Sequence, residues 1–236
     1  MLRHVSKNGS GRLLDVGCGD GTFLLAARAA GWRTAGTELN PELARAEGLD
    51  VHPALDGVRA LAPFDAITLW HVLEHLPNPG DTLDSLRALL APGGVLIIAV
   101  PDARGLQARW TGAQWLHLDV PRHLTHFGSV ALGKMLARYG FLRIAEWHGE
   151  FEYDVLGWSQ SALNRFSGEP NVFFDMLTGR MPRISIWRRR FQFCAGVLLS
   201  AVAVPLTVFG MLTRRSGTLI VAAKKSIAPH GIGQDG

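Results

Sequence analysis

The stretch "LLDVGCGDGTF", Leu13 to Phe23, decides the fold of this chain. Its apolar start is typical of a buried parallel strand, and the continuation "TFLLAARAAG" consists of helix formers and a closing glycine. Between them lie Gly17, Gly19 and Gly21, which let the backbone pass close beneath a ligand. The free N–H groups at the start of the helix favour an anionic or polar group there. The stretch therefore predicts a strand, a binding loop and a helix.

Strand and helix patterns alternate along the rest of the chain. We expect a helix that begins near Pro79 and closes at Pro92-Gly93-Gly94, and another at residues 129–140. The expected strands after the first are apolar runs between turn residues: "RTAGTEL", "FDAITLWHV", "GVLIIAVP", "FLRIAEW" and "GTLIVAAKK". This order predicts a doubly wound α/β sheet, with ligands at the carboxyl ends of the early strands.

Composition limits the class of protein. With 236 residues, 47% apolar and 19% charged, the chain is expected to be globular. Five arginines and no acid lie in residues 180–190, beside an apolar run, which favours an anionic membrane surface over nucleic acid as partner. Cys18 and Cys194 provide no disulfide framework, and the first residues are too polar for a secretory signal. We therefore expect a cytoplasmic protein.

An acidic residue follows the binding loop at a suitable distance for a nucleoside. Glu38 ends the second expected strand, 23 residues after Asp15, where a carboxylate can accept hydrogen bonds from both hydroxyls of a ribose. The alternative is a tight turn with a surface acid. The loop reads G-x-G-x-G, so its third glycine comes one residue earlier than in the dinucleotide fingerprint. An NAD(P)-dependent oxidoreductase is therefore the less favoured alternative.

Three segments carry a resemblance to a known family. "LDVGCGDGTF", "FDAITLWHVLEHLPNP" and "LRALLAPGGVLIIAVP" resemble motifs of the class I S-adenosylmethionine (SAM) dependent methyltransferases, over residues 12–102. The resemblance implies SAM as cofactor and a single methyltransferase domain over residues 1–236. It also implies a seven-stranded Rossmann-like sheet with an antiparallel last strand. A methyltransferase-like protein that binds SAM or a lipid without turnover is a further alternative.

The resemblance also implies which residues bind the cofactor. The loop would hold the methionine part of SAM, Glu38 and Leu39 the ribose, and Asp56 the adenine, while aromatic and histidine side chains follow the fourth strand beside the cofactor. The implied cofactor-binding residues are Asp15, Gly17, Cys18, Gly19, Asp20, Gly21, Glu38, Leu39, Asp56, Trp70, His71 and His75. An aromatic face beside a sulfonium is electrostatically favourable. The alternative is that Trp70 only packs and that Glu74 and His75 cap or pair locally.

A dense polar segment, "WLHLDVPRHLTHF" at residues 115–127, follows the fifth strand, on the side where an acceptor must approach. It resembles the matching part of the ubiquinone-biosynthesis O-methyltransferases. The chemistry needs alignment and removal of a proton, which a histidine can perform near neutral pH. The candidate catalytic residues are His126 and His117, then His123, together with Arg122 as an anion clamp and His71. The alternative is that these side chains only tie the loop down. Acidic ligands beside them are sparse, so no metal is predicted.

The run "FQFCAGVLLSAVAVPLTVFGML", Phe191 to Leu212, has 22 residues without a charge, enough to cross a bilayer. In the family the last strand returns to the sheet, which puts both ends of the run on one side of a membrane. We therefore expect the hydrophobic insertion at residues 170–216 to bend or form a hairpin near Pro205, anchored on the cytoplasmic face. The alternatives are an internal helix pair and a buried dimer contact. The acceptor would be a small molecule or a lipid-like one, and no oligomeric state is predicted.

Overall fold

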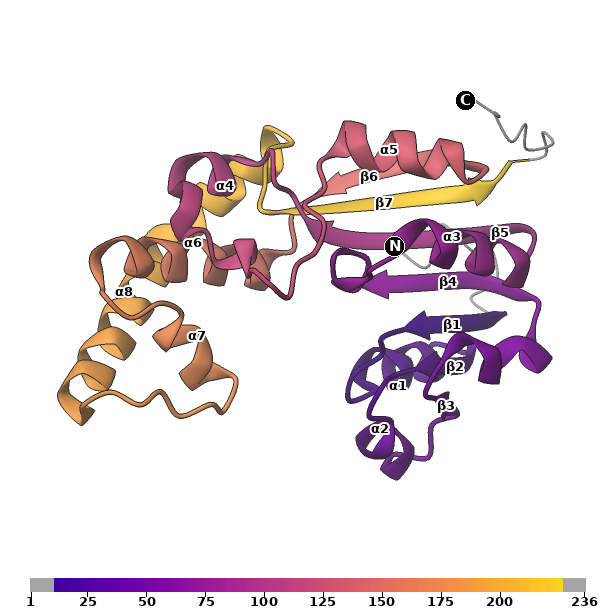
Figure 1. The fold of residues 1–236 in the computed structure, drawn as a ribbon, viewed down its shortest axis with the longest axis horizontal. Coiled ribbons are helices and arrows are strands. Elements are labelled where there is room, and N and C mark those ends of the chain that lie inside the picture. The colour runs from indigo at the N-terminus through magenta and orange to yellow at the C-terminus, as the bar shows by residue number, and fades with distance from the viewer. Residues whose placement is uncertain (1–10, 227–236) are drawn as a thin grey trace. The chain divides into compact units, whose positions relative to one another are not determined.

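The computed structural model describes residues 11–226. Within them, seven strands form one sheet in the order β3-β2-β1-β4-β5-β7-β6. The strands are β1 (Arg12–Val16), β2 (Arg33–Thr37), β3 (Val51–His52), β4 (Phe64–Trp70), β5 (Leu90–Pro101), β6 (Phe141–His148) and β7 (Thr218–Lys225). The last strand, β7, lies between β5 and β6 and runs antiparallel to β5 (Figure 1). The expected doubly wound sheet with an antiparallel final strand is confirmed.

The central strands are buried because they are apolar on both faces. β1 pairs in parallel with β2 and β4, which places Leu14 beside Ala35 on one side and Ile67 on the other. Leu14 and Ile67 have no exposed surface, and β5 is buried over its last eight residues. A parallel strand covered on both faces needs such a continuous apolar run. The carboxyl ends of β1, β2 and β4 consequently meet along one edge of the sheet.

Helices connect the strands in both halves of the chain. They are α1 (Thr22–Ala29), α2 (Glu42–Ala46), α3 (Pro79–Leu89), α4 (Leu106–Thr111), α5 (Ser129–Arg138), α6 (Phe151–Phe166), α7 (Val172–Leu177) and α8 (Ile186–Leu212), with short 3-10 turns η2 (Leu55–Leu61), η3 (Leu73–His75), η4 (Gly112–Gln114) and η5 (Leu116–Leu118).

The expected end of the helix that begins at Pro79 was wrong. α3 ends at Leu89, and Leu90 already pairs with Phe64 of β4 as the first residue of β5. The register between β4 and β5 shifts just after this pair, where residues 91–94 lie opposite the single residue Asp65 and an irregularity in the strand accommodates them. The proline and glycines therefore interrupt the strand ladder instead of closing the helix.

The chain divides into two compact units. The first unit contains residues 1–100, 130–146 and 221–236, and the second contains residues 101–129 and 147–220. The first unit holds the paired strands β1 to β4 with helices α1, α2, α3 and α5 (Figure 1). The second unit holds α4, α6, α7 and α8. The predicted insertion at residues 170–216 lies in the second unit. The expectation that it is an insertion within a single domain stays a prediction.

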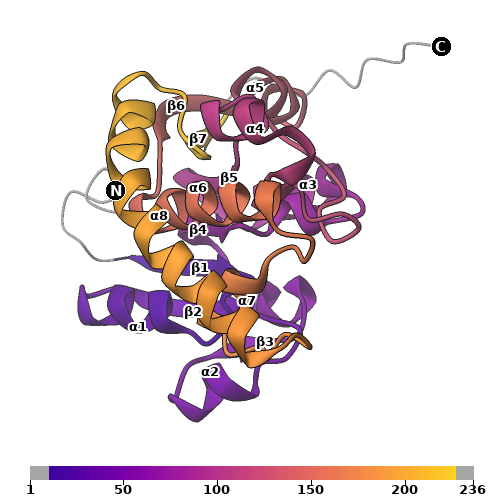
Figure 2. The same ribbon diagram turned by 90° about the vertical axis from the view of Figure 1, so that its left-hand side faces the viewer.

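The hydrophobic run forms one continuous helix, so the hairpin, one of the two expected shapes, was wrong, and the bend near Pro205 stays a prediction. α8 has 27 residues with Pro205 inside it, and it begins at Ser185, whose hydroxyl accepts a hydrogen bond from the Arg188 N–H at 3.4 Å. α8 packs against α6 and α7 (Figure 2). Residues buried against these neighbours occur on both sides of the proline, at Ala203 and Thr207. This packing supports one helix across Pro205.

The polarity of α8 is inverted relative to a helix of a water-soluble core. Its buried residues are small or polar, namely Gln192, Gly196, Ala203, Thr207 and Gly210. Beyond the arginines of its first turn, its exposed residues are mostly large and apolar, among them Phe191 at 72%, Leu198 at 69% and Leu212 at 79% exposure. A helix on a soluble domain places these two classes the other way round. Among residues 11–226, α8 is the one helix that is long and apolar enough to cross a membrane. Only 22% of its most apolar 18-residue stretch is buried inside the protein.

Candidate functional site

The glycine loop between β1 and α1 is anchored by the end of β2. The backbone N–H groups of Gly17 and Cys18 both donate to the Thr37 carbonyl, at 2.7 and 2.9 Å. Gly19 has a φ of 56°. A Cβ atom added at Gly19 would meet no described atom within 4 Å, whereas one at Gly21 would lie 2.3 Å from the Leu49 side chain. The loop is therefore packed at its end and open at its middle, as a ligand cradle requires.

The acidic residue predicted at ribose spacing lies against this loop. One Glu38 carboxylate oxygen accepts a hydrogen bond from the Gly19 N–H at 3.0 Å, and the other accepts one from the Asn40 N–H at 3.4 Å. The neighbouring Leu39 side chain is 83% exposed. The structure thus brings Glu38 together with the open glycine. Asp20 is exposed, and its carboxylate accepts the Thr22 N–H at 3.0 Å, a bond that lowers the pKa of Asp20.

Asp15 and Cys18 are buried beside the loop. The Thr68 hydroxyl donates a hydrogen bond of 2.6 Å to the Asp15 carboxylate. Burial outweighs this bond and raises the pKa of Asp15 to about 7. Burial, followed by the negative charges of Asp15 and Glu38, raises the pKa of the Cys18 thiol to about 11. A raised pKa disfavours the thiolate, the form in which a cysteine acts as a nucleophile.

Side chains at the end of β4 form a second part of the site in the first unit. Trp70 contacts Phe23 edge-on, with ring centroids 5.5 Å apart. Its indole Nε1 is buried without a hydrogen-bond partner among the described residues, although a buried indole N–H usually has one. His71 follows with a φ of 54°, a left-handed conformation that is uncommon for a non-glycine residue and frequent at functional sites.

Sequence reasoning left Glu74 outside the predicted site. Its side chain is 1% exposed, and its carboxylate lies 3.6 Å from the His71 Nδ1 atom. A buried carboxylate beside a histidine stabilises the protonated ring and fixes its orientation. The sequence offered one signal for Glu74, namely its position three residues after His71 and four residues after the end of the buried strand β4. His75 is exposed, and with Glu74 it offers two atoms of metal-ligand type within 4.8 Å of one another.

Asp56 lies on η2, after β3 as expected. Its carboxylate is exposed and forms an ion pair with Arg59 at 2.7 Å. An exposed pair of this kind contributes little to stability, so the side chain can reorient at small cost. Asp56 follows β3, which runs parallel to β2 and ends on the same side of the sheet. Its role toward adenine stays a prediction.

The predicted acceptor segment belongs to the second unit. His117 is buried, and its ring stacks on Tyr153 with centroids 5.7 Å apart and planes at 15°. The His123 Nδ1 atom donates to the His117 carbonyl at 2.7 Å, and its Nε2 atom lies 3.9 Å from the Asp119 carboxylate. Arg122 also pairs with Asp119, at 2.8 Å. Asp119 therefore holds both Arg122 and His123.

His126 differs from the other two histidines because its side chain is exposed. Its Nε2 atom lies 2.9 Å from the Leu118 carbonyl oxygen. A carbonyl only accepts, so Nε2 carries the proton of the neutral ring and Nδ1 is the basic nitrogen. The structure thus brings His117, His123 and His126 together in one loop with Asp119, while His71 lies in the first unit.

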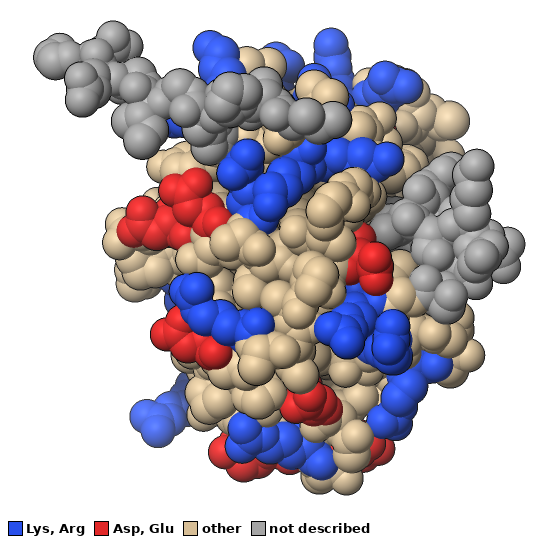
Figure 3. Space-filling view, turned by 90° about the vertical axis from the view of Figure 1, so that its right-hand side faces the viewer, with Lys and Arg blue, Asp and Glu red and all other residues tan. Residues whose placement is uncertain are grey.

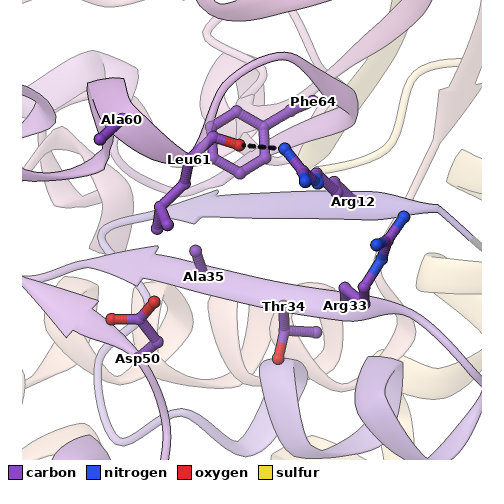
Figure 4. Close-up of a pocket in the computed structure, with 8 residues that line it drawn as sticks. All are labelled: Arg12, Arg33, Thr34, Ala35, Asp50, Ala60, Leu61 and Phe64. Carbon is purple, nitrogen blue, oxygen red and sulfur yellow. Dashed lines mark hydrogen bonds between the residues drawn. The ribbon is translucent and has the colours of Figure 1, made fainter.

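A cavity of ≈ 250 Å³ lies at the other edge of the first unit, where β1 and β2 begin (Figure 4). Arg12, Arg33 and Asp50 line it, and the Arg12 guanidinium donates to the Leu61 carbonyl at 2.9 Å. Basic and acidic side chains are interspersed on the face seen in Figure 3. Ligands of open α/β sheets bind at the carboxyl ends of the strands, so this cavity is not the candidate site.

The buried carboxyl of Asp15 generates a prediction about stability and pH. The native carboxyl keeps its proton up to a pKa of about 7, whereas the unfolded chain loses it near 3.8. Between these values the native state holds one more proton, so the free energy of unfolding falls as pH rises from 4 to 7, by on the order of 4 kcal/mol at most. Asp15→Asn should lack this decrease.

Urea unfolding of both proteins at pH 5, 6, 7 and 8, without added SAM, checks the prediction. The advantage of Asp15→Asn over the wild type should grow with pH and level off above about pH 7. Parallel pH profiles of the two proteins would contradict a raised pKa at Asp15.

Comparisons with known proteins place the chain in a family. Residues 2–145 match the family described as "Methyltransferase domain". Curated relatives include the ubiquinone biosynthesis O-methyltransferase of Xylella fastidiosa strain M23, 38% identical over 111 residues, covering 42% of this chain and 45% of the relative. The enzyme of the same name from Xanthomonas campestris strain B100 is 32% identical over 151 residues, covering 57% and 62%. The chain thus spans about half the length of the curated relatives it matches.

Solved structures agree with the fold. A SAM-dependent methyltransferase from Archaeoglobus fulgidus superposes with a TM-score of 0.56 and 19% identity, covering 95% of this chain and 91% of that one. One from Mesorhizobium loti gives a TM-score of 0.54 with 16% identity and covers 95% of each chain. The family match covers more than half of the residues and shows that the chain belongs to the methyltransferase domain family, and the solved structures show the same fold.

Proposed function

We propose that this methyltransferase transfers the methyl group to an oxygen atom of a small or lipid-linked acceptor at the cytoplasmic face of a membrane. The choice of oxygen is supported by the curated relatives, which are named ubiquinone biosynthesis O-methyltransferases. The choice of a membrane surface is supported by one observation, the inverted polarity of α8. An acceptor with an apolar part would meet the enzyme there without leaving the bilayer.

The first unit supplies the proposed cofactor site. SAM brings a methyl group on a positively charged sulfur. Glu38 would accept hydrogen bonds from the ribose hydroxyls, and the open middle of the loop at Gly19 leaves room for the methionine part. The unsatisfied Nε1 donor of Trp70 fits the edge of a polar ligand. Asp15, Gly17, Cys18, Asp20, Gly21, Leu39, Asp56, His71 and His75 complete the proposed site.

The acceptor segment supplies the proposed base. Removal of the hydroxyl proton requires a neutral imidazole with an accessible basic nitrogen. His126 has this arrangement, since its proton is held at Nε2 by the Leu118 carbonyl. His123 is less suited, because its side chain is buried and its Nε2 atom lies 3.9 Å from the Asp119 carboxylate, which leaves it less accessible to an acceptor. His117 is buried under Tyr153, and Arg122 is the proposed clamp for an anionic group of the acceptor.

The membrane part of the proposal is supported by α8 and its margins. Basic residues lie at both ends of the helix, as Arg188 to Arg190 and as Arg214 and Arg215. Each such charge contributes about 1 kcal/mol near an anionic surface. α8 packs along α6, which carries exposed Glu152 and Arg165, so a crossing of the bilayer would expose these charges to lipid. We therefore favour a helix that lies in the interface.

The proposed ribose contact predicts the effect of Glu38→Ala. Loss of the carboxylate should weaken SAM binding by about 10–100-fold, because a hydrogen bond to a charged group contributes about 1.5–3 kcal/mol. Isothermal titration calorimetry with SAM measures this change. Glu42→Ala, an exposed acid on the next helix, is the control and should bind SAM normally. Equal affinities for the wild type and Glu38→Ala would remove Glu38 from the site.

The proposed base predicts the effect of His126→Ala. The turnover number should fall by about 10²–10⁴-fold while the affinity for SAM stays unchanged, because the side chain acts on the acceptor proton. The loss should shrink as pH rises and hydroxide replaces the base. His52→Ala, in the first unit, is the matched control. Full activity of His126→Ala would transfer the role to His117 or His123.

Methyl transfer itself is the test of the proposed function. The purified protein is incubated with SAM carrying a radiolabelled methyl group and a total cell extract, and the products are partitioned between organic solvent and water. Label in the organic phase, absent with Glu38→Ala, is the expected result for a lipid-linked acceptor. Label only in water would overturn the lipid part of the proposal. Alkaline hydrolysis of the product separates a methyl ester from an ether.

A further inference from the structure

The second unit contains a small apolar cavity of ≈ 100 Å³, formed by α4, α6 and α8. Its walls share apolar side chains from all three helices: Trp110, Trp158, Ala162, Leu199, Val202 and Leu206. The volume is about three times the share of a water molecule in the liquid and smaller than the cavity of about 150 Å³ that holds benzene. It admits a narrow chain and is too small for a sugar or a bulky ring.

The chemistry of the lining favours hydrocarbon over water. Ser159 is the hydroxyl residue in the lining. Its Oγ atom donates to the Val155 carbonyl at 2.8 Å and accepts from the Ser200 hydroxyl at 3.1 Å. The hydroxyl is therefore satisfied by its neighbours. A water molecule needs two to four polar partners, which this cavity does not offer, whereas an alkyl chain gains dispersion contacts with the two indole rings.

The cavity opens on the exposed apolar face of α8. Its rim residues Trp110, Val202 and Leu206 are 58%, 56% and 43% exposed, whereas Trp158 and Ala203 at the back are buried. The rings of Trp110 and Trp158 lie 5.7 Å apart with planes at 54°. Rigid aromatic walls and a buried floor distinguish this place from the rest of the α8 surface. Trp110 is also of the type enriched at membrane interfaces.

The charges at both ends of α8 indicate which molecule would reach the cavity. Arg188 is already paired with Glu169 at 2.6 Å, and Arg190 lies over the Trp187 ring at 5.6 Å. Arg189, Arg214 and Arg215 add positive charge at the two margins, and α8 itself carries no acid. Such an arrangement complements anionic headgroups above a hydrocarbon layer.

We propose that this cavity holds a segment of one acyl chain of an anionic phospholipid of the membrane. The inference rests on the proposed membrane location, and it assigns the second unit a lipid-binding site that is separate from the cofactor site. An acyl chain seated between Trp110 and Trp158 would fix the position of α8 along the membrane surface, which a uniformly apolar helix face does not do.

Photocrosslinking tests the proposal on the full chain. Vesicles of phosphatidylglycerol whose acyl chain carries a diazirine are mixed with the protein, irradiated and analysed by mass spectrometry. Labels are expected at the rim and walls of the cavity. Ala162→Phe, which fills the cavity, should lose them, whereas Ala201→Phe, at an exposed position of α8 outside the lining, should keep them. Val202→Trp, at the exposed rim, covers the opening without a change in the core and should also lose them.

Sedimentation with the same vesicles separates this inference from the proposed function. The cavity variants should still sediment, because the exposed face of α8 is retained. Labels spread evenly along α8, or unchanged in both Ala162→Phe and Val202→Trp, would overturn the cavity proposal and leave the membrane location standing. Equal labelling from phosphatidylcholine vesicles would overturn the preference for anionic lipid. Failure of the wild type to sediment would refute the membrane location itself.

Discussion

Three successive backbone amides of the glycine loop are held by the end of β2. The N–H groups of Gly17 and Cys18 donate to the Thr37 carbonyl, and that of Gly19 donates to the Glu38 carboxylate. The loop can turn back in this way only because β2 itself makes room, since a Cβ atom at Gly36 would lie 2.8 Å from the Cys18 sulfur. The pairing of β1 with β2 thus determines the shape of the glycine loop, and Trp70 and His71 lie at the end of β4 along the same edge of the sheet.

The same edge explains why buried ionisable groups occur in an otherwise apolar sheet. Asp15 is the next-to-last residue of β1, and Glu74 lies in the turn after β4. Both side chains are almost fully buried. Thr68 and His71 are their respective partners. Burial of a carboxyl group is costly unless it is hydrogen-bonded or paired, and both groups occur near the ends of parallel strands. The contacts with Thr68 and His71 offset part of this cost.

The sequence predicted the fold because its strand and helix patterns are local and strong. The seven-stranded sheet with an antiparallel β7 followed from the family resemblance and was confirmed. Pro205 left a hairpin and a bent helix as alternatives, and the run forms one helix with Ala203 and Thr207 buried on either side of the proline. Glu74 was missed because its burial depends on how the turn after β4 folds, which composition does not reveal. The assignment of catalytic and cofactor residues in the site stays a prediction.

The small and polar side chains of α8 are buried inside the protein, and this affects how the protein associates with other molecules. Folding alone covers the small residues of the helix and leaves its largest apolar side chains in contact with solvent. Exposed apolar side chains of this size favour contact with another apolar surface, and in lipid-free buffer the nearest one is another copy of the chain. An oligomer observed under those conditions would grow with protein concentration and dissolve in mild detergent. Its size would then report the solvent composition rather than a native quaternary structure.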